Sequence, residues 1–483
     1  AFACWLGRDR AGPTRKILAD ANIPTYDSPE DAIRAVTHVT NYWKNQETLI
    51  QTPSSVADGF VPDTDHASAI VRGALAQGRD RLTIREVTQV FRSYAIPMVD
   101  TLTAKTPDDA ARLGEALGFP IALKLLSATP GLGADGSDVA LDLGSVDEVR
   151  HAAEAMIRRL RDLNPHAQVE GFHVREMIRR PDAIELSAGA FTDPIFGPVI
   201  QFGHGGAESD LIADWAIALP PLNMALAAEL IGRTRVARLL GGFHGREPAY
   251  VADVQLTLVK LAYLMADIPA VHRVEINPLL ADGRGVLAIS ASMTVAETAG
   301  ASGSHLAIKP YPKELEERVM LGGRPVVLRP IRPEDEPEHR HLLERISPDD
   351  IRFRFFTQIR QFAHTDLARF TQIDYDREMA FIASAPGDLG QRETLGVVRT
   401  IADPNNDLGE FAILVRSDLK GKGLGRILME KMVRYARRRG LAELRGQVLS
   451  DNLAMRGLAE RIGFKVVPSA DPGVMDVSLH LDR

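Results

Sequence analysis

The sequence predicts a multidomain α/β protein, and three observations lead to that prediction. The chain has 483 residues, which is enough for several domains at about 100–200 residues each. Apolar residues make up 45% and charged residues 25% of the chain, the balance of a globular protein with buried cores. Strand-like and helix-like stretches alternate along most of the sequence, as they do in α/β and α+β domains.

Composition excludes several classes of protein. The single cysteine, Cys4, excludes an internal disulfide and a cysteine-rich zinc site, and it favours a reducing compartment. The formal net charge of -7 argues against a protein that coats nucleic acid. No apolar run reaches the roughly 18 residues of a membrane-spanning helix, and the N-terminus has no secretory signal pattern. We therefore expect a cytoplasmic location and no nucleic-acid or membrane partner. Because the chain starts at Ala1, we interpret it as a fragment or a processed chain.

Residues 1–50 read as the end of an α/β unit. A short strand at 1–6 is followed by a helical pattern that places Ile17, Leu18 and Ala21 on one face. A second strand then leads into a helix, for which Ser28 is the expected N-cap and Pro29 the first residue. Residues 51–80 have little periodicity and are predicted to be a linker.

Residues 81–312 are predicted to form the second domain. Helices are expected over 84–94 and 107–117, with a strand after Pro97. The segment IALKLL at 121–126 reads as a buried strand that contains Lys124. The alternation of elements continues through EINPLL at 275–280 and predicts an α/β or α+β domain.

Residues 313–483 are predicted to form the third domain. Strands are expected at 379–384, 394–401 and 409–416, and a long helix follows. In that helix Leu424, Leu428, Met432 and Tyr435 fall on one face of a 3.6-residue period, and Gly440 is the expected stop. A further strand, LRGQVL, and a helix from Asp451 complete the domain.

The stretch from Glu410 to Gly425 carries the most chemical information. A strand runs into KGKGLG at 420–425, and a helix starts there at once. Glycines allow tight turns, and a helix N-terminus offers unpaired N–H donors, which together suit a pyrophosphate. The spacing is neither GxxxxGK[ST] nor GxGxxG, so the turn is not a nucleoside triphosphate loop or a dinucleotide fingerprint. A plain strand–helix turn is the alternative.

The form basic-x-x-G-x-G resembles the acetyl-CoA loop of the GNAT acetyltransferase superfamily. Further motifs stand in the expected order: LRPIRPED at 328–335, FRFF at 353–356, QIDYDREMAFIA at 372–383, GVVR at 396–399, GEFAILV at 409–415, DNLAM at 451–455 and IGF at 462–464. The set resembles the bacterial Pat-type protein lysine acetyltransferases, which carry an acyl-CoA-synthetase-like region before a C-terminal GNAT domain. The resemblance covers nearly the whole chain and implies a mixed-sheet α/β fold for the third domain.

The resemblance implies a site for acetyl-CoA, bound as a substrate. Asn452 matches an asparagine that contacts the cofactor in the superfamily, and a simple helix cap is the alternative for it. The strand backbone at Leu414 and Val415 should pair with the pantetheine arm, and Arg426 should add a charge contact. The residues expected to surround the pyrophosphate are Lys420, Gly421, Lys422, Gly423, Leu424 and Gly425.

Glu410 matches the family's glutamate in GEFA and is the predicted catalytic base. A lysine amine has a reference pKa of about 10.4 and must lose a proton before it attacks a thioester. A solvent-facing glutamate at a strand end is the alternative. A tyrosine acid is expected after the last helix, but that position reads Gly463-Phe464, so no acid is assigned. Asp374, Tyr375 and Asp376 could form an acidic entrance for the substrate lysine or an ordinary turn.

Residues 82–310 resemble the ATP-grasp region of NDP-forming acyl-CoA synthetases, and residues 1–50 resemble the end of their flavodoxin-like domain. Lys124 matches the nucleotide-binding lysine of that family, and Glu275 and Asn277 resemble residues near its metal site. The glycine-rich FGPVIQFGHGG at 196–206 matches a further signature.

Two departures from that family predict that the second domain is degenerate. The run ATPGLGADGSDVA at 128–140 lacks the family's His and Lys, and Ser290 and Ser292 replace its Asp-x-Arg. A serine hydroxyl is a poor Mg²⁺ ligand, and phosphoryl transfer needs a held metal. We therefore expect no metal site and no ligase activity. The domain would bind a nucleotide or acyl-CoA as a sensor, or support the fold.

The resemblance implies a protein lysine acetyltransferase that acts on AMP-forming acyl-CoA synthetases by direct attack in a ternary complex. Cys4 lies far from the predicted site in sequence, which argues against a cysteine acyl-enzyme. Two alternatives stay open: an active NDP-forming acyl-CoA synthetase of the acetate–CoA ligase type, and a non-catalytic CoA-sensing regulator. The target, acyl-chain preference and oligomeric state are left open.

Overall fold

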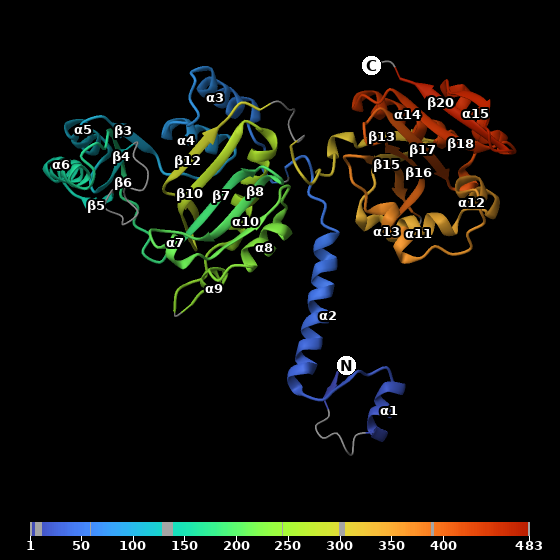
Figure 1. Cartoon of the computed structure of the whole chain (residues 1–483), viewed down its shortest axis with the longest axis horizontal. Helices are drawn as coiled ribbons and strands as arrows, with labels where there is room; N and C mark the ends of the chain where they lie inside the picture. Colours follow the sequence, from blue (N-terminus) through green and yellow to red (C-terminus); the bar gives the residue numbers. More distant parts are fainter. Residues whose placement is uncertain are drawn as a thin grey trace.

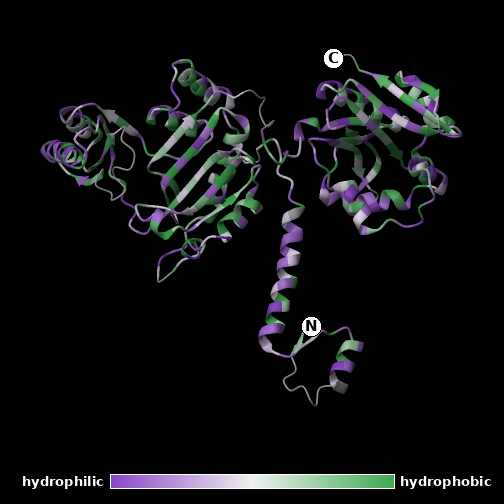
Figure 2. Ribbon diagram, in the orientation of Figure 1, coloured by the Kyte–Doolittle hydropathy of each residue, from purple (hydrophilic) through white to green (hydrophobic). Residues whose placement is uncertain are grey.

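A computed structural model of the chain describes residues 2–4, 12–57, 59–127, 139–243, 245–298, 305–387 and 391–481. Figure 1 shows three parts: a small N-terminal unit with a protruding helix, a middle domain with two lobes, and a C-terminal domain. Figure 2 shows that hydrophobic residues concentrate on the strands of the two larger parts, whereas the protruding helix is mostly hydrophilic. No helix of the described residues combines the length and the apolar character needed to span a membrane.

The N-terminal unit is a small parallel β-α-β arrangement, as the sequence predicts. Ser28 accepts a hydrogen bond from Asp31 N at 3.1 Å, and Pro29 opens the following helix, so the predicted cap is confirmed. Tyr42 and Trp43 of that helix are exposed. The elements are β1 (Ala3–Cys4), α1 (Gly12–Asp20), β2 (Thr25–Tyr26) and α2 (Pro29–Leu49).

The predicted linker at 51–80 is wrong for residues 64–76. Residues Thr64–Ala76 form helix α3, capped by Asp63, and its residues Ala67, Val71 and Ala74 are buried in the core of the middle domain. Small apolar residues spaced four and three apart make a narrow buried face, which a search for large hydrophobic side chains does not detect. The extended connection between domains is therefore shorter than predicted.

The middle domain contains a six-stranded and a four-stranded sheet. The predicted helix at 107–117 is confirmed without change, and that at 84–94 ends one residue early. The strand order is β3-β6-β4-β5 in the small lobe and β11-β10-β7-β8-β9 in the large lobe, where β12 also pairs with β10. The elements are α4 (Ile84–Ser93), β3 (Thr101–Ala104), α5 (Pro107–Leu117), β4 (Ile121–Ser127), β5 (Val139–Leu143), α6 (Val146–Leu163), β6 (Val169–Glu176), β7 (Ile184–Asp193), β8 (Gly197–His204), α7 (Ser209–Ile212), β9 (Trp215–Ala218), α8 (Met224–Gly232), α9 (Ala237–Leu240), α10 (Val251–Asp267), β10 (Val271–Asp282), β11 (Gly285–Ala288) and β12 (Ala291–Val295).

The C-terminal domain is built on one mixed eight-stranded sheet in the order β13-β14-β15-β16-β17-β18-β20-β19. All neighbouring pairs are antiparallel except β17 with β18. The elements are η1 (Lys313–Leu315), β13 (Glu317–Leu321), β14 (Arg324–Pro330), η2 (Pro333–Asp335), α11 (Glu336–Glu344), α12 (Pro348–Phe355), α13 (His364–Thr371), β15 (Glu378–Pro386), β16 (Arg392–Ala402), β17 (Leu408–Val415), η3 (Ser417–Leu419), α14 (Leu424–Arg439), β18 (Glu443–Leu449), α15 (Leu453–Ile462), β19 (Lys465–Pro468) and β20 (Val474–His480).

Helices cover both faces of this sheet. The predicted face of α14 is confirmed: Leu424, Leu428 and Met432 are buried on the sheet, and Gly440 ends the helix at φ 84°. A second apolar cluster, which includes Ile351 of α12 and Leu367 of α13, covers the opposite face. The interior residues of β15 are therefore buried on both sides, which fixes the position of the strands that follow it.

Candidate active site

Strands β17 and β18 run side by side and then separate. Their parallel ladder starts at Leu408 and Glu443 and ends where Glu410 lies opposite Arg445. On its other edge β17 stays paired with β16 as far as Val415. The backbone from 411 to 415 therefore has one edge that no strand of the described residues covers. Such an edge can pair with an extended ligand that carries amide groups.

Glu410 stands at the point where the two strands separate. Side chains alternate along a strand, so Glu410 projects to the same face as Leu414, which packs in the α11–α13 cluster. Its backbone carbonyl accepts a hydrogen bond from Thr400 Oγ1 at 3.2 Å. Its carboxylate is exposed and makes no hydrogen bond or ion pair with any residue that the structure describes. The carboxylate is therefore available to accept a proton.

Arg354 of α12 lies within electrostatic reach of Glu410. The pKa of Arg354 is lowered to about 10, mainly by burial and also by the Arg399 guanidinium, while Glu410 acts in the opposite direction. Arg399 itself forms an ion pair with Glu378 on β15. Arg354 is therefore a charged neighbour of Glu410 on this side of the sheet.

The loop between β17 and α14 contains two glycines at positions where the backbone conformation, and not a lack of space, favours glycine. Gly421 has φ +75° and Gly423 has φ +91°, and a Cβ at either position would meet nothing within 4 Å. Gly423 caps α14, and Ile427 N donates to Gly423 O as the first bond of the helix. The N–H groups ahead of Ile427 in α14 have no intrahelical acceptor, and such groups are donors that an anion can bind.

Gly425 has a different role from the two loop glycines. A Cβ at this position would lie 3.3 Å from Leu458 Cδ2 of α15. Glycine here lets α14 and α15 approach each other closely. The three glycines of KGKGLG therefore serve two purposes, loop conformation and helix packing.

Several predicted cofactor residues use their side chains within the protein. Lys420 forms an ion pair with Asp350, and Arg426 bonds Glu430 at 2.6 Å. Leu414 is buried and Val415 is partly buried, which leaves their backbone as the group that can meet a ligand. Lys422 is exposed. The loop therefore presents backbone amides more than side-chain charges.

Asn452 follows β18, on the other side of the gap between the separated strands. Its Oδ1 accepts a hydrogen bond from Met455 N at 3.1 Å, so it caps α15 as the alternative interpretation states. The cap uses Oδ1 and does not use the Nδ2 group. Phe464, at the position where a tyrosine acid was expected, packs on Phe411 with ring centroids 5.0 Å apart.

The segment Asp374–Asp376 forms a turn, and its side chains face the junction with the middle domain. Asp374 Oδ1 accepts from Asp376 N at 3.0 Å, which is the turn interpretation. Asp376 forms ion pairs with Arg439 at 3.0 Å and with Lys309 at 3.9 Å. Asp376 and Tyr375 line a cavity between the two domains. Asp376 is therefore held at the junction, and the bond between Asp374 and Asp376 agrees with the turn, one of the two alternatives for this segment.

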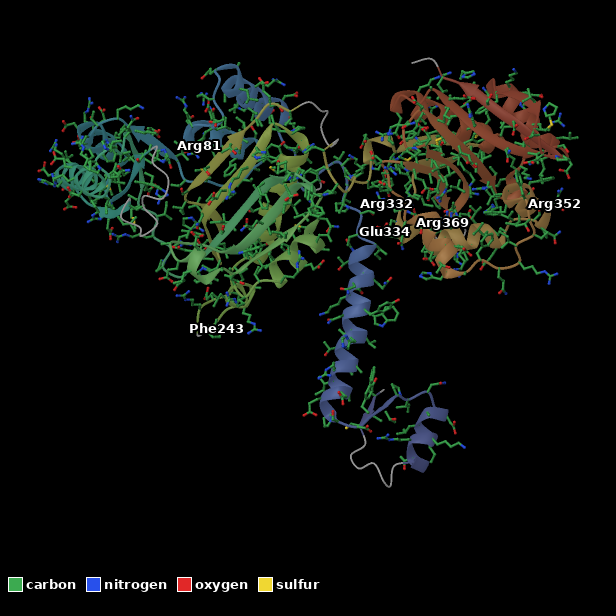
Figure 3. All side chains as sticks on the ribbon, viewed as in Figure 1. Arg81, Phe243, Arg332, Glu334, Arg352 and Arg369 are labelled. Carbon is green, nitrogen blue, oxygen red and sulfur yellow. The ribbon has the colours of Figure 1, made fainter. Side chains whose placement is uncertain are left out.

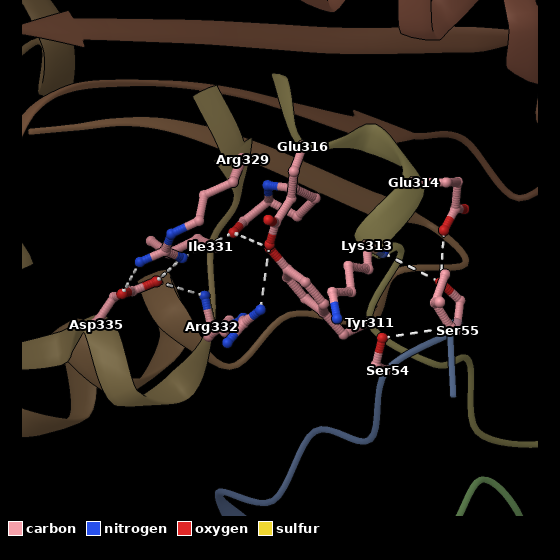
Figure 4. Close-up of polar contacts among 12 residues, drawn as sticks. Ser54, Ser55, Tyr311, Lys313, Glu314, Glu316, Arg329, Ile331, Arg332 and Asp335 are labelled. Atoms are coloured by element: carbon pink, nitrogen blue, oxygen red, sulfur yellow. Dashed lines mark hydrogen bonds and ion pairs between the residues drawn. The ribbon is translucent and has the colours of Figure 1, made fainter. Parts of the chain in front are cut away.

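Polar contacts join the linker to the start of the C-terminal domain (Figure 4). Ser55 N donates to Tyr311 O at 2.8 Å, and Lys313 N donates to Ser55 Oγ at 3.1 Å. Tyr311 OH donates to Glu316 at 2.6 Å, and the Arg332 guanidinium lies 3.9 Å from the Tyr311 ring centroid. These contacts fix the chain where it enters the C-terminal sheet.

The predicted nucleotide-site residues of the middle domain lie in one cleft between its two lobes. Lys124, Glu275 and Asn277 line this cleft, which has a volume of about 790 Å³. His173 lies opposite Lys124 in the sheet, and its pKa is lowered to about 4, mainly by burial and also by the charges of Lys124 and Arg175. Asn277 Oδ1 accepts from Gly206 N at 2.8 Å, which ties EINPLL to the glycine-rich segment at 196–206.

Ser290 and Ser292 line the same cleft. Ser292 pairs with Glu275 in the sheet, and Ser290 O accepts from Asn277 N at 3.1 Å. Within the described part of the chain no three His, Cys, Asp or Glu side chains gather in a group that could hold a metal ion. The residues present therefore do not fit an Mg²⁺ site like that of the ligases. The predicted loss of the family's His and Lys in the run at 128–140 concerns mainly residues 128–138, which lie outside the described residues.

The structure adds site residues that were not predicted from the sequence. Asp350 and Arg352 of α12 contact the loops that follow β17 and β18, respectively. They lie about 60–100 residues before those loops in sequence, and acidic and basic residues on a short helix are commonplace. The motif FRFF at 353–356 contains Arg354, and only the fold shows that this residue lies near Glu410.

Comparisons with known proteins divide the chain at the same place as the structure. Residues 73–295 match an ATP-grasp domain, and residues 347–464 match the acetyltransferase (GNAT) family. The chain is 34% identical over 150 residues to the acetyltransferase PA5475 of Pseudomonas aeruginosa, which covers 31% of this chain and 79% of that protein. The chain belongs to the GNAT acetyltransferase family. Its C-terminal domain is a GNAT-type N-acetyltransferase domain.

The region before the GNAT domain is similar to CoA ligases. The chain is 25% identical over 284 residues to the ADP-forming 4-hydroxybutyrate–CoA ligase of Nitrosopumilus maritimus, a match of 59% of this chain and 40% of that ligase. The chain therefore spans well under half the length of that relative. The GNAT domain of S. lividans PAT is 26% identical, covers 35% of this chain and 99% of its own, and has a TM-score of 0.33.

Proposed function

We propose that this protein is a protein lysine acetyltransferase, which transfers the acetyl group of acetyl-CoA to the ε-amine of a lysine on another protein. The observation that carries the proposal is the end of the β17–β18 ladder at Glu410. An unpaired carboxylate, an uncovered strand edge and a glycine loop at a helix N-terminus follow one another from that point. The edge suits a pantetheine arm, the loop suits a pyrophosphate, and the carboxylate can take a proton from an amine that attacks the thioester.

The reaction follows from this arrangement. The pantetheine amides pair with the backbone of 411–415, and the N–H groups of the loop bind the pyrophosphate. Glu410 takes a proton from the substrate ammonium, directly or through one water. The free amine attacks the thioester carbonyl, the C–N bond forms, and the C–S bond breaks. CoA leaves as a thiolate and takes up a proton, and the substrate keeps an acetylated lysine.

A direct transfer in a ternary complex is the expected route. Cys4 lies in the N-terminal unit, and no other cysteine exists in the sequence. A cysteine acyl-enzyme would therefore lack a nucleophile. No general acid is needed, because a thiolate is a good leaving group.

We propose AMP-forming acyl-CoA synthetases as the substrate class, on the likeness to Pat-type enzymes. The test incubates the full chain with labelled acetyl-CoA and a purified synthetase of this class, and then with cell lysate. Label on the active-site lysine of the synthetase, lost with Glu410→Gln, is the expected result. Transfer to free small amines only, with no labelled protein, would contradict the proposal.

The similarity of the middle region to ADP-forming CoA ligases supports a second candidate function, acyl-CoA synthesis. Ser290 and Ser292 at the cleft argue against it, since neither supplies a carboxylate for Mg²⁺. The discriminating assay measures ADP-dependent cleavage of acetyl-CoA in the presence of Mg²⁺ and phosphate. Turnover on the scale of a working ligase, about 1 per second or more, would favour synthesis over acetyl transfer.

A further inference from the structure

Helix α12 contacts both segments that border the gap between β17 and β18. At its first turn Asp350 reaches the loop that follows β17, and two residues later Arg352 reaches Asp451, which follows β18. The helix lies at the outer edge of the domain in Figure 1, where Arg352 is labelled in Figure 3. One short helix therefore connects the two sides of the expected cofactor site.

The contacts of Asp350 hold its side chain in one position. The residue is buried, with 7% of its surface exposed. Its Oδ2 accepts from Ser417 Oγ at 2.6 Å, and its Oδ1 pairs with Lys420 Nζ. Ser417 Oγ also accepts from Ser347 N at 2.9 Å, so the loop is bonded to the helix N-terminus twice. Burial alone would raise the pKa of Asp350, but the bonds from Lys420 and Ser417 outweigh it and keep the pKa below its usual range.

We infer that Asp350 is a positioning residue for acetyl-CoA and that Lys420 acts through it rather than on the pyrophosphate. The inference rests on the proposed function, since it concerns the same site. Lys420 is the first residue of KGKGLG, where direct contact with a phosphate was expected. Its ammonium group is instead neutralised by a buried carboxylate, and the pair holds the backbone of 417–420 in place. The amides of the following glycines are thereby fixed where a pyrophosphate can bind them.

Arg352 makes a comparable contact on the β18 side of the gap. Its guanidinium bonds Asp451 at 2.5 Å, next to Asn452. Both side chains are partly exposed, at 34% and 57%, so this pair contributes less than the buried one. The helix thus sets the width of the gap through a strong contact on the β17 side and a weak contact on the β18 side.

The experiment measures KM for acetyl-CoA and kcat in the full chain for Asp350→Asn, Lys420→Met and the double variant. We expect each single variant to raise KM about tenfold with kcat changed less than about twofold, because the loop binds the cofactor and does not do the chemistry. The double variant should have the KM of either single variant, since both remove one pair. Asp349→Asn, an exposed neighbour on the same helix, is the matched control and should keep the wild-type KM.

Two results would overturn the inference. One is an unchanged KM in Asp350→Asn. The other is a Lys420→Met substitution that raises KM by the same factor whether or not Asp350→Asn is present, because a direct phosphate ligand acts independently of Asp350. If Asp350→Asn does not fold, the double variant, which leaves no unpaired charge, is compared with Lys420→Met alone. An equal, raised KM supports the inference, and a wild-type KM overturns it.

The outcomes also separate this inference from the proposed function. A wild-type chain that binds no acetyl-CoA overturns both. A wild-type chain that transfers acetyl groups while Asp350→Asn keeps the wild-type KM overturns the role of Asp350 alone. For the second contact, Arg352→Asp should raise KM about threefold, and adding Asp451→Arg should restore it, as expected of an exposed ion pair. Failure of the reversed pair to restore KM would remove Arg352 from the inference.

Discussion

Glu410 lies directly opposite Arg445, and this pair is the last between β17 and β18. Arg445 bonds Glu443 on its own strand at 3.0 Å, so it does not neutralise Glu410. The proposed base therefore lies where the two strands separate and where the uncovered edge of β17 begins. Any change that extended the ladder past this pair would close the site.

Replacing Glu410 by glutamine should abolish acetyl transfer and leave acetyl-CoA binding intact. The amide keeps the shape of the side chain but cannot take a proton from the substrate amine. We expect kcat to fall by about 10²–10⁴-fold, the usual range for loss of a general base. Label transfer and calorimetry measure the two quantities. Glu344→Gln, exposed on α11, is the control, and retained transfer by Glu410→Gln would remove Glu410 from the mechanism.

Gly423→Asp should weaken acetyl-CoA binding more than Gly423→Asn does. Both substitutions place a side chain at φ +91°, a conformation that Asn and Asp tolerate better than other residues. Only aspartate adds a negative charge beside the expected pyrophosphate. We expect Kd for the aspartate variant to exceed that of the asparagine variant by about tenfold at low salt. Equal Kd values by calorimetry would show that no anion binds at this helix N-terminus.

Asn452→Asp separates capping from ligand binding. Aspartate is as good an N-cap as asparagine, so α15 should keep its stability. If the Nδ2 group of Asn452 contacts the cofactor, the carboxylate removes that donor and adds a repelling charge, and KM should rise about three- to tenfold. Thermal melting and KM are measured together. An unchanged KM with an unchanged melting temperature would leave Asn452 as a helix cap alone.

ATP binding in the middle-domain cleft should not depend on Mg²⁺. The cleft contains Lys124, but Ser290 and Ser292 present hydroxyl groups and no carboxylate to a metal. We expect calorimetry to give Kd values for ATP within about twofold of each other with and without Mg²⁺, because an Mg²⁺ site needs carboxylate ligands. Ser290→Asp should create a difference by adding a carboxylate near Glu275. A strong Mg²⁺ enhancement in the wild type would contradict the reading of the cleft as degenerate.

Acid should destabilise the GNAT domain through His339. The pKa of this residue is lowered to about 4, mainly by burial and also by the charge of Arg399, while Asp335 acts in the opposite direction. In the unfolded chain the pKa of this histidine is near 6.5. As the pH falls from 6.5 toward 4, the unfolded chain therefore takes up a proton, and the folded chain does not. The free energy of unfolding should therefore fall by about 2 kcal/mol between pH 7 and pH 5.

Hydrogen exchange of β15 peptides in the full chain, corrected for the intrinsic pH dependence of exchange, measures this loss. His339→Leu should show a smaller loss between pH 7 and pH 5 than the wild type, because a leucine takes up no proton in either state. His341→Leu, exposed on the same helix, should show the wild-type loss. Identical pH dependence in the wild type and His339→Leu would exclude His339 as the source.

Local patterns in the sequence were enough to place many elements. The apolar spacing of α14, the Ser28–Pro29 start of α2 and the helix at 107–117 all follow from interactions within a few residues, and the structure confirms them. The predicted linker failed at α3, because its buried face consists of small residues whose role depends on the domain that they contact. Periodicity detects a helix face best when that face carries large side chains.

What the sequence determined by itself is the chemistry available: the glycine loop, the glutamate in GEFA and the serines at 290 and 292 in place of an Asp-x-Arg. These depend on residue identity and on neighbours along the chain. Only the tertiary structure decided where β17 and β18 separate, that Lys420 is held by Asp350, and that Asp376 faces the middle domain. Each of these is a contact between segments far apart in sequence. Such contacts depend on how the sheet twists and which helix crosses it, and no local pattern encodes them.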